Sequence, residues 1–258
     1  MSLYQQEFNF KGVVFSNSPT IKNEATARNL SILPIVKRNK FKLPVFKELM
    51  GTLIHKYNAS FYGYMNSDIL LSPRIFSLLP KAELMYNSHR SSRYLELASR
   101  VKVVDSIFSV DNFKTLESCS EVFSNSYPGY FRSNLTAVIF QTNINIQDIF
   151  IFSRHFPFNK IPRVVVGRAY VDSVIMQTAR AVGGRLIDIT NYSMSWQFLF
   201  DIAIHYHQGR DTFRNHTFEK QSEEDKEFNK QFLRKGVVTL HDAKFSVNSN
   251  GEFVKKTK

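Results

Sequence analysis

Residues 61–72 read FYGYMNSDILLS and place a carboxylate, Asp68, just after an apolar run that is typical of a buried strand. A strand interior seldom keeps an unpaired carboxylate, because removing its charge from water is costly. At the carboxyl end of a strand in an α/β sheet, the same group faces a ligand crevice. Asn66-Ser67-Asp68 therefore has two interpretations. It is either a ligand-binding loop or an Asx turn that leads into a helix at Pro73.

Strand-like and helical patterns alternate on both sides of this stretch. The predicted strands cover residues 11–19 (a strand and loop), 31–36, 60–65, 100–108, 161–167 and 185–190, and the predicted helices cover 20–30, 44–57 and 170–184. Strands that alternate with helices favour an α/β domain whose twisted, mostly parallel sheet is flanked by helices. Residues 109–145 carry no pattern that assigns an element.

Composition narrows the classes of protein. The chain has 258 residues, of which 43% are hydrophobic, and a single cysteine, Cys119. An intramolecular disulfide and a cysteine-based zinc cluster are therefore excluded, and no run of 18 apolar residues predicts a membrane span. The formal charge of +12 favours anionic partners, namely nucleotide phosphates, nucleic acid, acidic glycans or lipid head groups. No phosphate-binding glycine loop or zinc-protease motif is present.

A second stretch with chemical potential is GRAYVDSVIMQTARAVGGRLIDIT, residues 167–190. Asp172 lies near the start of the predicted helix, where the helix dipole stabilises an anion. A carboxylate on such a rigid element can act as a general base on an acceptor hydroxyl. The alternative is a helix cap, and residue patterns alone leave both open.

Taken together, YGYMNSDILLS, QDIFIFSR, IPRVVVGRAYVDSVIM and AVGGRLIDIT resemble the GT-A fold glycosyltransferases that use nucleotide-diphospho-sugars. In that family a D-x-D or x-x-D motif ends a central strand and binds the metal and the sugar diphosphate. An acidic residue at a later helix start often serves as the base. The resemblance covers about residues 11–200 and implies transfer of a sugar from a nucleotide-diphosphate donor to a hydroxyl acceptor, such as that of a glycan.

The resemblance also implies roles for individual residues. Asp68 corresponds to the ligand of Mn²⁺ or Mg²⁺, and Asn66 stands where the motif begins, usually with Asp. Asp172 corresponds to the base, and Asp148 corresponds to an acidic position near the acceptor. Arg168 is expected to add positive charge beside the diphosphate.

Domain organisation follows from the same comparison. Residues 1–210 are expected to form a GT-A-like domain that lacks the family's first strand, and 211–258 a charged C-terminal extension. Two alternatives remain: a catalytically silent relative that binds a glycan or partner, and a basic nucleic-acid-binding protein. Nucleic acid is the less favoured partner, because no aromatic RNA-binding motif accompanies the basic segments. The compartment is open: a Golgi or secretory lumen if an upstream anchor exists, and the cytoplasm otherwise.

Overall fold

The computed structural model describes residues 4–66, 69–70, 74–88, 94–100, 102–104, 147–190, 196–198, 223–234 and 236–256. Its longer helices are α2 (Pro19–Ala27), α3 (Phe46–Lys56), α4 (Arg74–Ser88) and α7 (Val171–Ala181). Its short helical turns are α1 (Tyr4–Glu7), η3 (Phe158–Lys160), α11 (Glu223–Lys226), η5 (Phe228–Phe232) and η6 (Leu240–Asp242). Its strands are β1 (Val13–Phe15), β2 (Ser31–Leu33), β3 (Phe61–Met65), β4 (Ile69–Leu70), β5 (Tyr94–Arg100), β6 (Lys102–Val104), β7 (Gln147–Ser153), β8 (Gly184–Asp188), β9 (Trp196–Phe198), β10 (Phe245–Val247) and β11 (Phe253–Lys255).

The main sheet has six strands in the order β11-β10-β8-β5-β7-β3. β8 pairs in parallel with β5 and with β10, whereas β7 is antiparallel to both of its neighbours, β3 and β5. The α/β class is confirmed, but the prediction of a mostly parallel sheet is wrong, because the sheet is mixed. An apolar run predicts a strand and not its direction. The direction of β7 depends on the connection that precedes it, and residues 109–145 of that connection carry no pattern that assigns an element.

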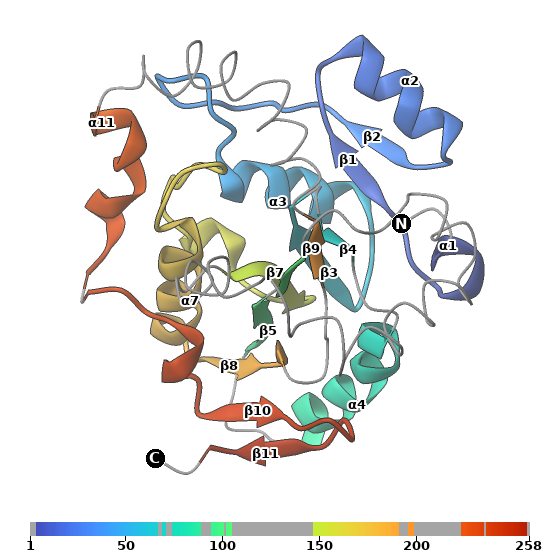
Figure 1. Ribbon diagram of the computed structural model, residues 1–258, viewed down its shortest axis with the longest axis vertical. Helices are drawn as coiled ribbons and strands as arrows, with labels where there is room; N and C mark the ends of the chain where they lie inside the picture. The colour runs from blue at the N-terminus through green and yellow to red at the C-terminus, as the bar shows by residue number, and fades with distance from the viewer. Residues whose placement is uncertain are drawn as a thin grey trace.

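Helices cover both faces of this sheet (Figure 1). α3 and α7 lie on one face, over a core that includes Phe46, Phe150 and Phe152. α4 lies on the other face, where Leu78 packs in a second core with β5 and β8 residues such as Leu95. Strand residues alternate between the two cores, as the pleat of a sheet requires. The sheet therefore has no solvated face over its central strands.

Local patterns predicted many of these elements correctly. The predicted helices at 20–30, 44–57 and 170–184 correspond to α2, α3 and α7. The predicted strands at 31–36, 60–65 and 185–190 correspond to β2, β3 and β8, and β1 falls within 11–19. Gly183 has φ +81 just after α7, which confirms the predicted helix stop. β3, however, is the edge strand rather than a central strand.

Residues 161–167 form a loop with three buried side chains, so the prediction of a strand there is wrong. Ile161, Val164 and Val165 are each fully buried, which explains the strand-like apolar run. Pro162 has no N–H to give to a ladder. Apart from an isolated bridge between Val45 and Val165, the loop joins no sheet.

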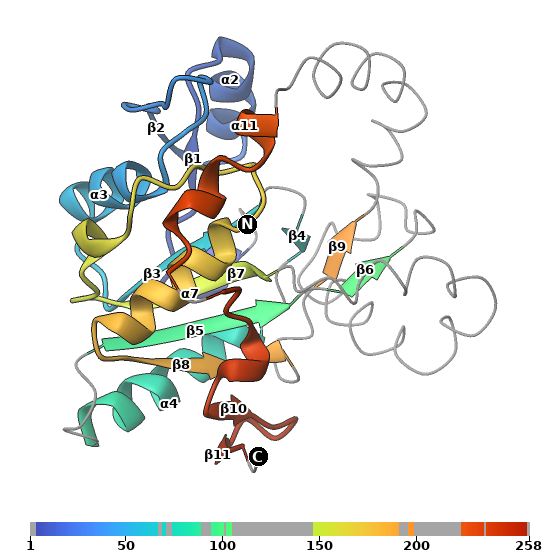
Figure 2. The ribbon, with the colours of Figure 1, turned by 90° about the vertical axis from the view of Figure 1, so that its left-hand side faces the viewer.

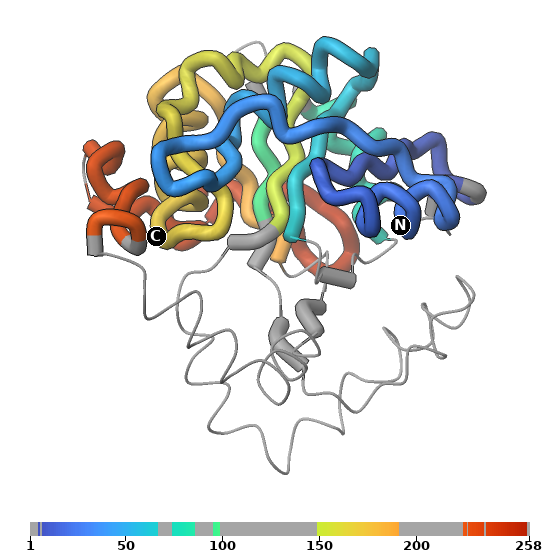
Figure 3. Tube along the Cα trace, turned by 90° about the horizontal axis from the view of Figure 1, so that it is seen from above, coloured from blue at the N-terminus to red at the C-terminus, as the bar shows by residue number. Residues whose placement is uncertain are grey.

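The C-terminal segment of the described chain belongs to the main sheet. β10 lies beside β8, and β11 pairs with β10 on the outer side. Figure 3 shows the C-terminal end of the chain in red on the side of the molecule opposite the blue α2. The predicted boundary at residue 210 lies outside the described residues. Residues 245–247 of the predicted extension nonetheless complete the sheet on which α7 packs.

Hydropathy of the helices bears on membrane insertion. Within the described ranges, every helix is too short or too polar to span a bilayer.

Candidate functional site

Four elements bring their ends to one edge of the main sheet. β3, β5 and β8 point toward this edge, and antiparallel β7 begins there. Figure 2 shows the arrowheads of β5 and β8 on this side, with β6 and β9 of a small three-stranded sheet beyond them. Ligands of open α/β sheets bind outside the carboxyl ends of the strands. This carboxyl edge is therefore the candidate region for a ligand-binding site.

Helix α7 also begins at the carboxyl edge. The chain passes from its last turn through Gly183 directly into β8, so α7 runs antiparallel to β8. The helix and the strand are each about 16 Å long, so the start of the helix lies near the end of the strand. Asp172, in the first turn of α7, is thereby brought to the same end of the sheet as Asp188.

The strand register shows which residues share the α3/α7 face. One row across the sheet consists of Asp188, Ala98, Phe150 and Tyr64. Two residues further along β3, Asn66 follows Tyr64 at the carboxyl edge. Because side chains repeat every second residue, Asn66 and Asp188 lie on the face that α7 covers. The edge thus gathers Asn66, Asp172 and Asp188 on one side of one sheet.

Asn66 is held in position by the strand that precedes it. The Tyr64 hydroxyl donates to Oδ1 of Asn66 at 2.9 Å, and the Tyr64 ring packs edge-on against Phe46 of α3. The side chain of Asn66 is half-buried. A helix, an aromatic ring and a hydroxyl therefore fix this amide at the end of β3.

Asp172 is half-buried at the second position of α7. Its Oδ1 accepts the backbone N–H of Ser173 at 2.8 Å. The helix residue before it, Val171, follows Tyr170 in the left-handed conformation with φ 68. The placement at a helix N-terminus agrees with the sequence, and the N–H contact fits either a cap or an anion held ready as a base.

The two other predicted acidic site residues are Asp68 and Asp148. Asp68 lies outside the described residues. Asp148 is the second residue of β7, and the register between β5 and β7 passes from Ser99↔Ile149 to Arg100↔Gln147. Asp148 is therefore the extra residue of an irregularity at the carboxyl edge. Such bulges re-aim side chains and are frequent beside active sites.

Arg168 makes an internal ion pair. Its Nη2 lies 2.8 Å from Oδ2 of Asp225, and its Nε donates to Oδ1 at 3.1 Å. The two side chains are 14% and 8% exposed. Its charge is thus compensated by a carboxylate of the C-terminal segment, and the predicted contact with a diphosphate requires this bidentate pair to open.

Asp188 is a residue of the edge that sequence reasoning missed. Oδ1 accepts from the N–H and the hydroxyl of Thr190, and Oδ2 accepts from Nζ of Lys256 at 2.9 Å. The Lys256 ammonium also donates to the Leu240 carbonyl. The signal was present: RLIDIT ends an apolar strand with a carboxylate, as the stretch before Asp68 does.

Glu96 lies one row below the edge and was also missed. It is fully buried in the middle of β5, with Leu186 and Phe152 directly opposite on the neighbouring strands. Neither of its carboxyl oxygens has a hydrogen-bond partner among the described residues. Burial raises the pKa of this carboxyl from 4.5 to about 8, so it is mostly protonated at neutral pH.

A metal ion at this edge would need oxygen ligands. Among the described residues, no group of three or more His, Cys, Asp or Glu side chains could hold one. Amide oxygens such as Asn66 Oδ1 are among the hard oxygen ligands that Mg²⁺ and Mn²⁺ accept, in a shell completed by water and phosphate oxygens. The described edge therefore fits a metal shared with a ligand better than a cage built by the protein alone.

Comparison with known proteins found no match among family models, curated proteins or solved structures.

Proposed function

We propose that the chain binds a nucleotide-diphospho-sugar at the carboxyl edge and transfers the sugar to an acceptor hydroxyl. One observation carries the proposal. Asn66, after β3, and Asp172, at the start of α7, lie at the same edge of the main sheet and on the same side of it. Asp68 follows Asn66 by two residues in the sequence. The resemblance to GT-A glycosyltransferases relates the same residues to the donor and to the base.

Donor binding is assigned to the residues after β3. Asp68 would hold Mn²⁺ or Mg²⁺, with Asn66 Oδ1 as a neutral neighbouring ligand. A divalent ion on a diphosphate stabilises the charge that develops on the leaving group. Asn66 in place of an acid leaves one negative charge fewer than a D-x-D motif supplies. We therefore expect weak donor binding, with a dissociation constant of about 1 mM.

Proton transfer is assigned to Asp172. A base must be ionised at working pH, and the N-terminus of an eleven-residue helix favours the carboxylate. The acceptor hydroxyl would give its proton to the Asp172 carboxylate as the sugar carbon is attacked, in an inverting transfer. Asp148, at the irregular start of β7, is assigned to orienting the acceptor.

The test combines binding with turnover. Calorimetry with a panel of UDP- and GDP-sugars and Mn²⁺ is expected to detect a donor whose binding falls in Asp68→Ala and in EDTA. Glu83→Ala on the exposed side of α4 is the matched control and is expected to bind normally. Asp172→Asn keeps the shape and removes the base, so turnover is expected to fall about 10²–10⁴-fold while donor binding persists.

Three outcomes separate the alternatives. Donor binding without turnover in the parent protein identifies a catalytically silent relative. Full turnover in Asp172→Asn removes the base role and leaves Asp172 as a helix cap. Failure of every donor, together with RNA binding whose affinity falls steeply with salt, identifies a basic nucleic-acid-binding protein instead.

A further inference from the structure

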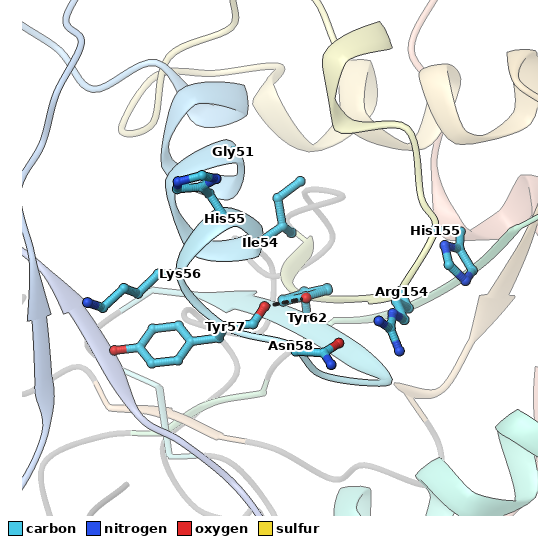
Figure 4. A pocket seen from close by; sticks show the side chains of 9 residues that line it. All are labelled: Gly51, Ile54, His55, Lys56, Tyr57, Asn58, Tyr62, Arg154 and His155. Atoms are coloured by element: carbon cyan, nitrogen blue, oxygen red, sulfur yellow. Dashed lines mark hydrogen bonds between the residues drawn. The ribbon is translucent and has the colours of Figure 1, made fainter.

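A basic hollow lies at the opposite end of the main sheet from the carboxyl edge. It has a volume of about 720 Å³ and lies between the last turns of α3 and the residues after β7 (Figure 4). Tyr62, at the start of β3, forms part of its wall. The register pairs Phe61 with Ser153, which places Arg154 beside the same strand start. Across the five residues of β3, the hollow and Asn66 are about 17 Å apart.

Four basic side chains line this hollow: His55, Lys56, Arg154 and His155. All four are exposed, and within the described residues none of them has an ion pair or side-chain hydrogen bond. By contrast, the Arg168 guanidinium is paired with the Asp225 carboxylate, and the Lys256 ammonium with Asp188. The hollow therefore concentrates uncompensated positive charge, and an anion entering it displaces no internal partner.

Gly51 of α3 lines the hollow, although the space around it does not require a glycine. A Cβ built at this position meets nothing within 4 Å, and its φ is not positive. Glycine inside a helix costs about 1 kcal/mol relative to alanine. Its presence leaves the helix backbone bare on the side of the hollow, which lets a ligand approach closely.

The wall opposite the helix is rigid. The Tyr62 hydroxyl donates to the Tyr57 carbonyl at 2.6 Å and accepts the Ala59 N–H at 3.3 Å. Figure 4 shows this bond beside Asn58 and Arg154. Lys11 Nζ lies 5.5 Å from the centroid of the Tyr57 ring and adds a further cation nearby. A preorganised wall lowers the entropic cost of holding a ligand.

From these observations we infer that the hollow binds the phosphate or sulfate ester of a sugar-sized ligand. Lys56 and Arg154 supply permanent charge, and the Arg154 guanidinium can take two ester oxygens at once. Asn58 and the two imidazoles offer hydrogen bonds to a sugar ring or to further ester oxygens. The volume suits a ligand of one or two rings. The inference does not rest on transfer at the carboxyl edge, and either can fail alone.

The experiment measures binding of three probes by calorimetry at constant ionic strength: inorganic pyrophosphate, a sulfated disaccharide and its unsulfated counterpart. Pyrophosphate or the sulfated disaccharide is expected to bind, and the unsulfated one is not. The probe that binds tells phosphate from sulfate esters. Lys56→Ala/Arg154→Ala is expected to weaken binding at least about tenfold. Lys22→Ala/Lys81→Ala removes the same charge from α2 and α4 and is expected to bind normally.

A second pair of variants tests the position of the ligand rather than its charge. Gly51→Gln places a side chain against the hollow and is expected to weaken binding, whereas Ala27→Gln adds a comparable side chain to the exposed side of α2 and is expected to bind normally. Both keep the net charge, and a thermal midpoint at or above that of the parent shows that both fold. The inference is overturned if neither anionic probe binds at millimolar concentration. It is also overturned if Gly51→Gln binds normally, or if the two double variants lose affinity equally.

Discussion

Replacing Glu96 by leucine should remove a pH-dependent loss of stability from this protein. The Glu96 carboxyl is buried in β5 between Leu186 and Phe152 without a hydrogen-bond partner among the described residues, and its pKa is about 8 instead of 4.5. A leucine has a similar volume and suits both neighbours. Glu96→Leu should therefore keep the sheet and abolish the titration.

The sign and the size follow from linkage. Because the folded-state pKa is raised, the stability contribution of the neutral acid is complete below pH 4.5 and is lost as the pH rises toward 8. In that window the folded state holds a proton that the unfolded chain has released. Each pH unit costs about 1.4 kcal/mol, so the parent should lose about 4 kcal/mol relative to Glu96→Leu between pH 5 and pH 8.5.

Urea unfolding followed by circular dichroism at pH 5, 7 and 8.5 measures this difference. Comparing the parent with the variant at each pH cancels every other titrating group. Glu96→Gln is the control, since it stops the titration but still buries a polar group, and it should be less stable than the leucine variant. Equal pH dependence in parent and Glu96→Leu would show that Glu96 is not the buried acid inferred here.

Three further predictions concern stability and are checked by the same unfolding measurement at pH 7. Asn229→Ala should cost about 2–4 kcal/mol, because Asn229 is fully buried and its amide satisfies both the N–H and the carbonyl of Val165; a cost below about 1 kcal/mol would contradict this. Arg168→Ala should cost about 3–5 kcal/mol by removing the guanidinium that pairs with the buried Asp225 carboxylate, and adding Asp225→Ala should recover part of that loss; strict additivity of the two changes would argue against the pair. Gly51→Ala should stabilise by about 0.5–1 kcal/mol, since its methyl group meets no atom, and destabilisation would mean that the space is filled.

Sequence patterns predicted elements whose signal is local. The helix predicted at 44–57, the glycines that end the helix predicted at 170–184, and the strand before Asn66 each follow from residue spacing within one segment. The carboxylates at strand ends were visible on the same basis, and Asp172 was correctly predicted at a helix start. The residues that lie near Asp172 at the carboxyl edge were not predictable, because they depend on the order of the strands in the sheet.

The central strand β5 shows where local patterns mislead. Residues 94–100 follow His89, Arg90 and Arg93, and a basic run of this kind is typical of a solvated surface. The alternation of Leu95 and Leu97 around Glu96 predicts, at most, a strand with one polar face. In the protein both faces are covered, and the carboxyl is buried.

The loop at 161–167 shows a second reason. Its side chains at Ile161, Val164 and Val165 are as buried as those of a strand, but the N–H and the carbonyl of Val165 are satisfied by Asn229, a side chain from the C-terminal segment. Asn229 stands in a run of Glu, Lys and Gln that predicts a solvated surface. Only tertiary contact distinguishes an asparagine that binds a loop from one that faces water.

The order of strands in the main sheet has a consequence for how the chain is synthesised. In the described sheet β3 pairs only with β7. During synthesis β3 therefore stays unpaired until residues 147–153 have emerged from the ribosome. β8 likewise presents an open edge until residues 245–247 arrive. Unpaired strand edges on nascent chains are where aggregation begins. The growing chain is therefore more vulnerable than the finished protein, and a polypeptide released before β10 would expose a strand edge that the complete sheet covers.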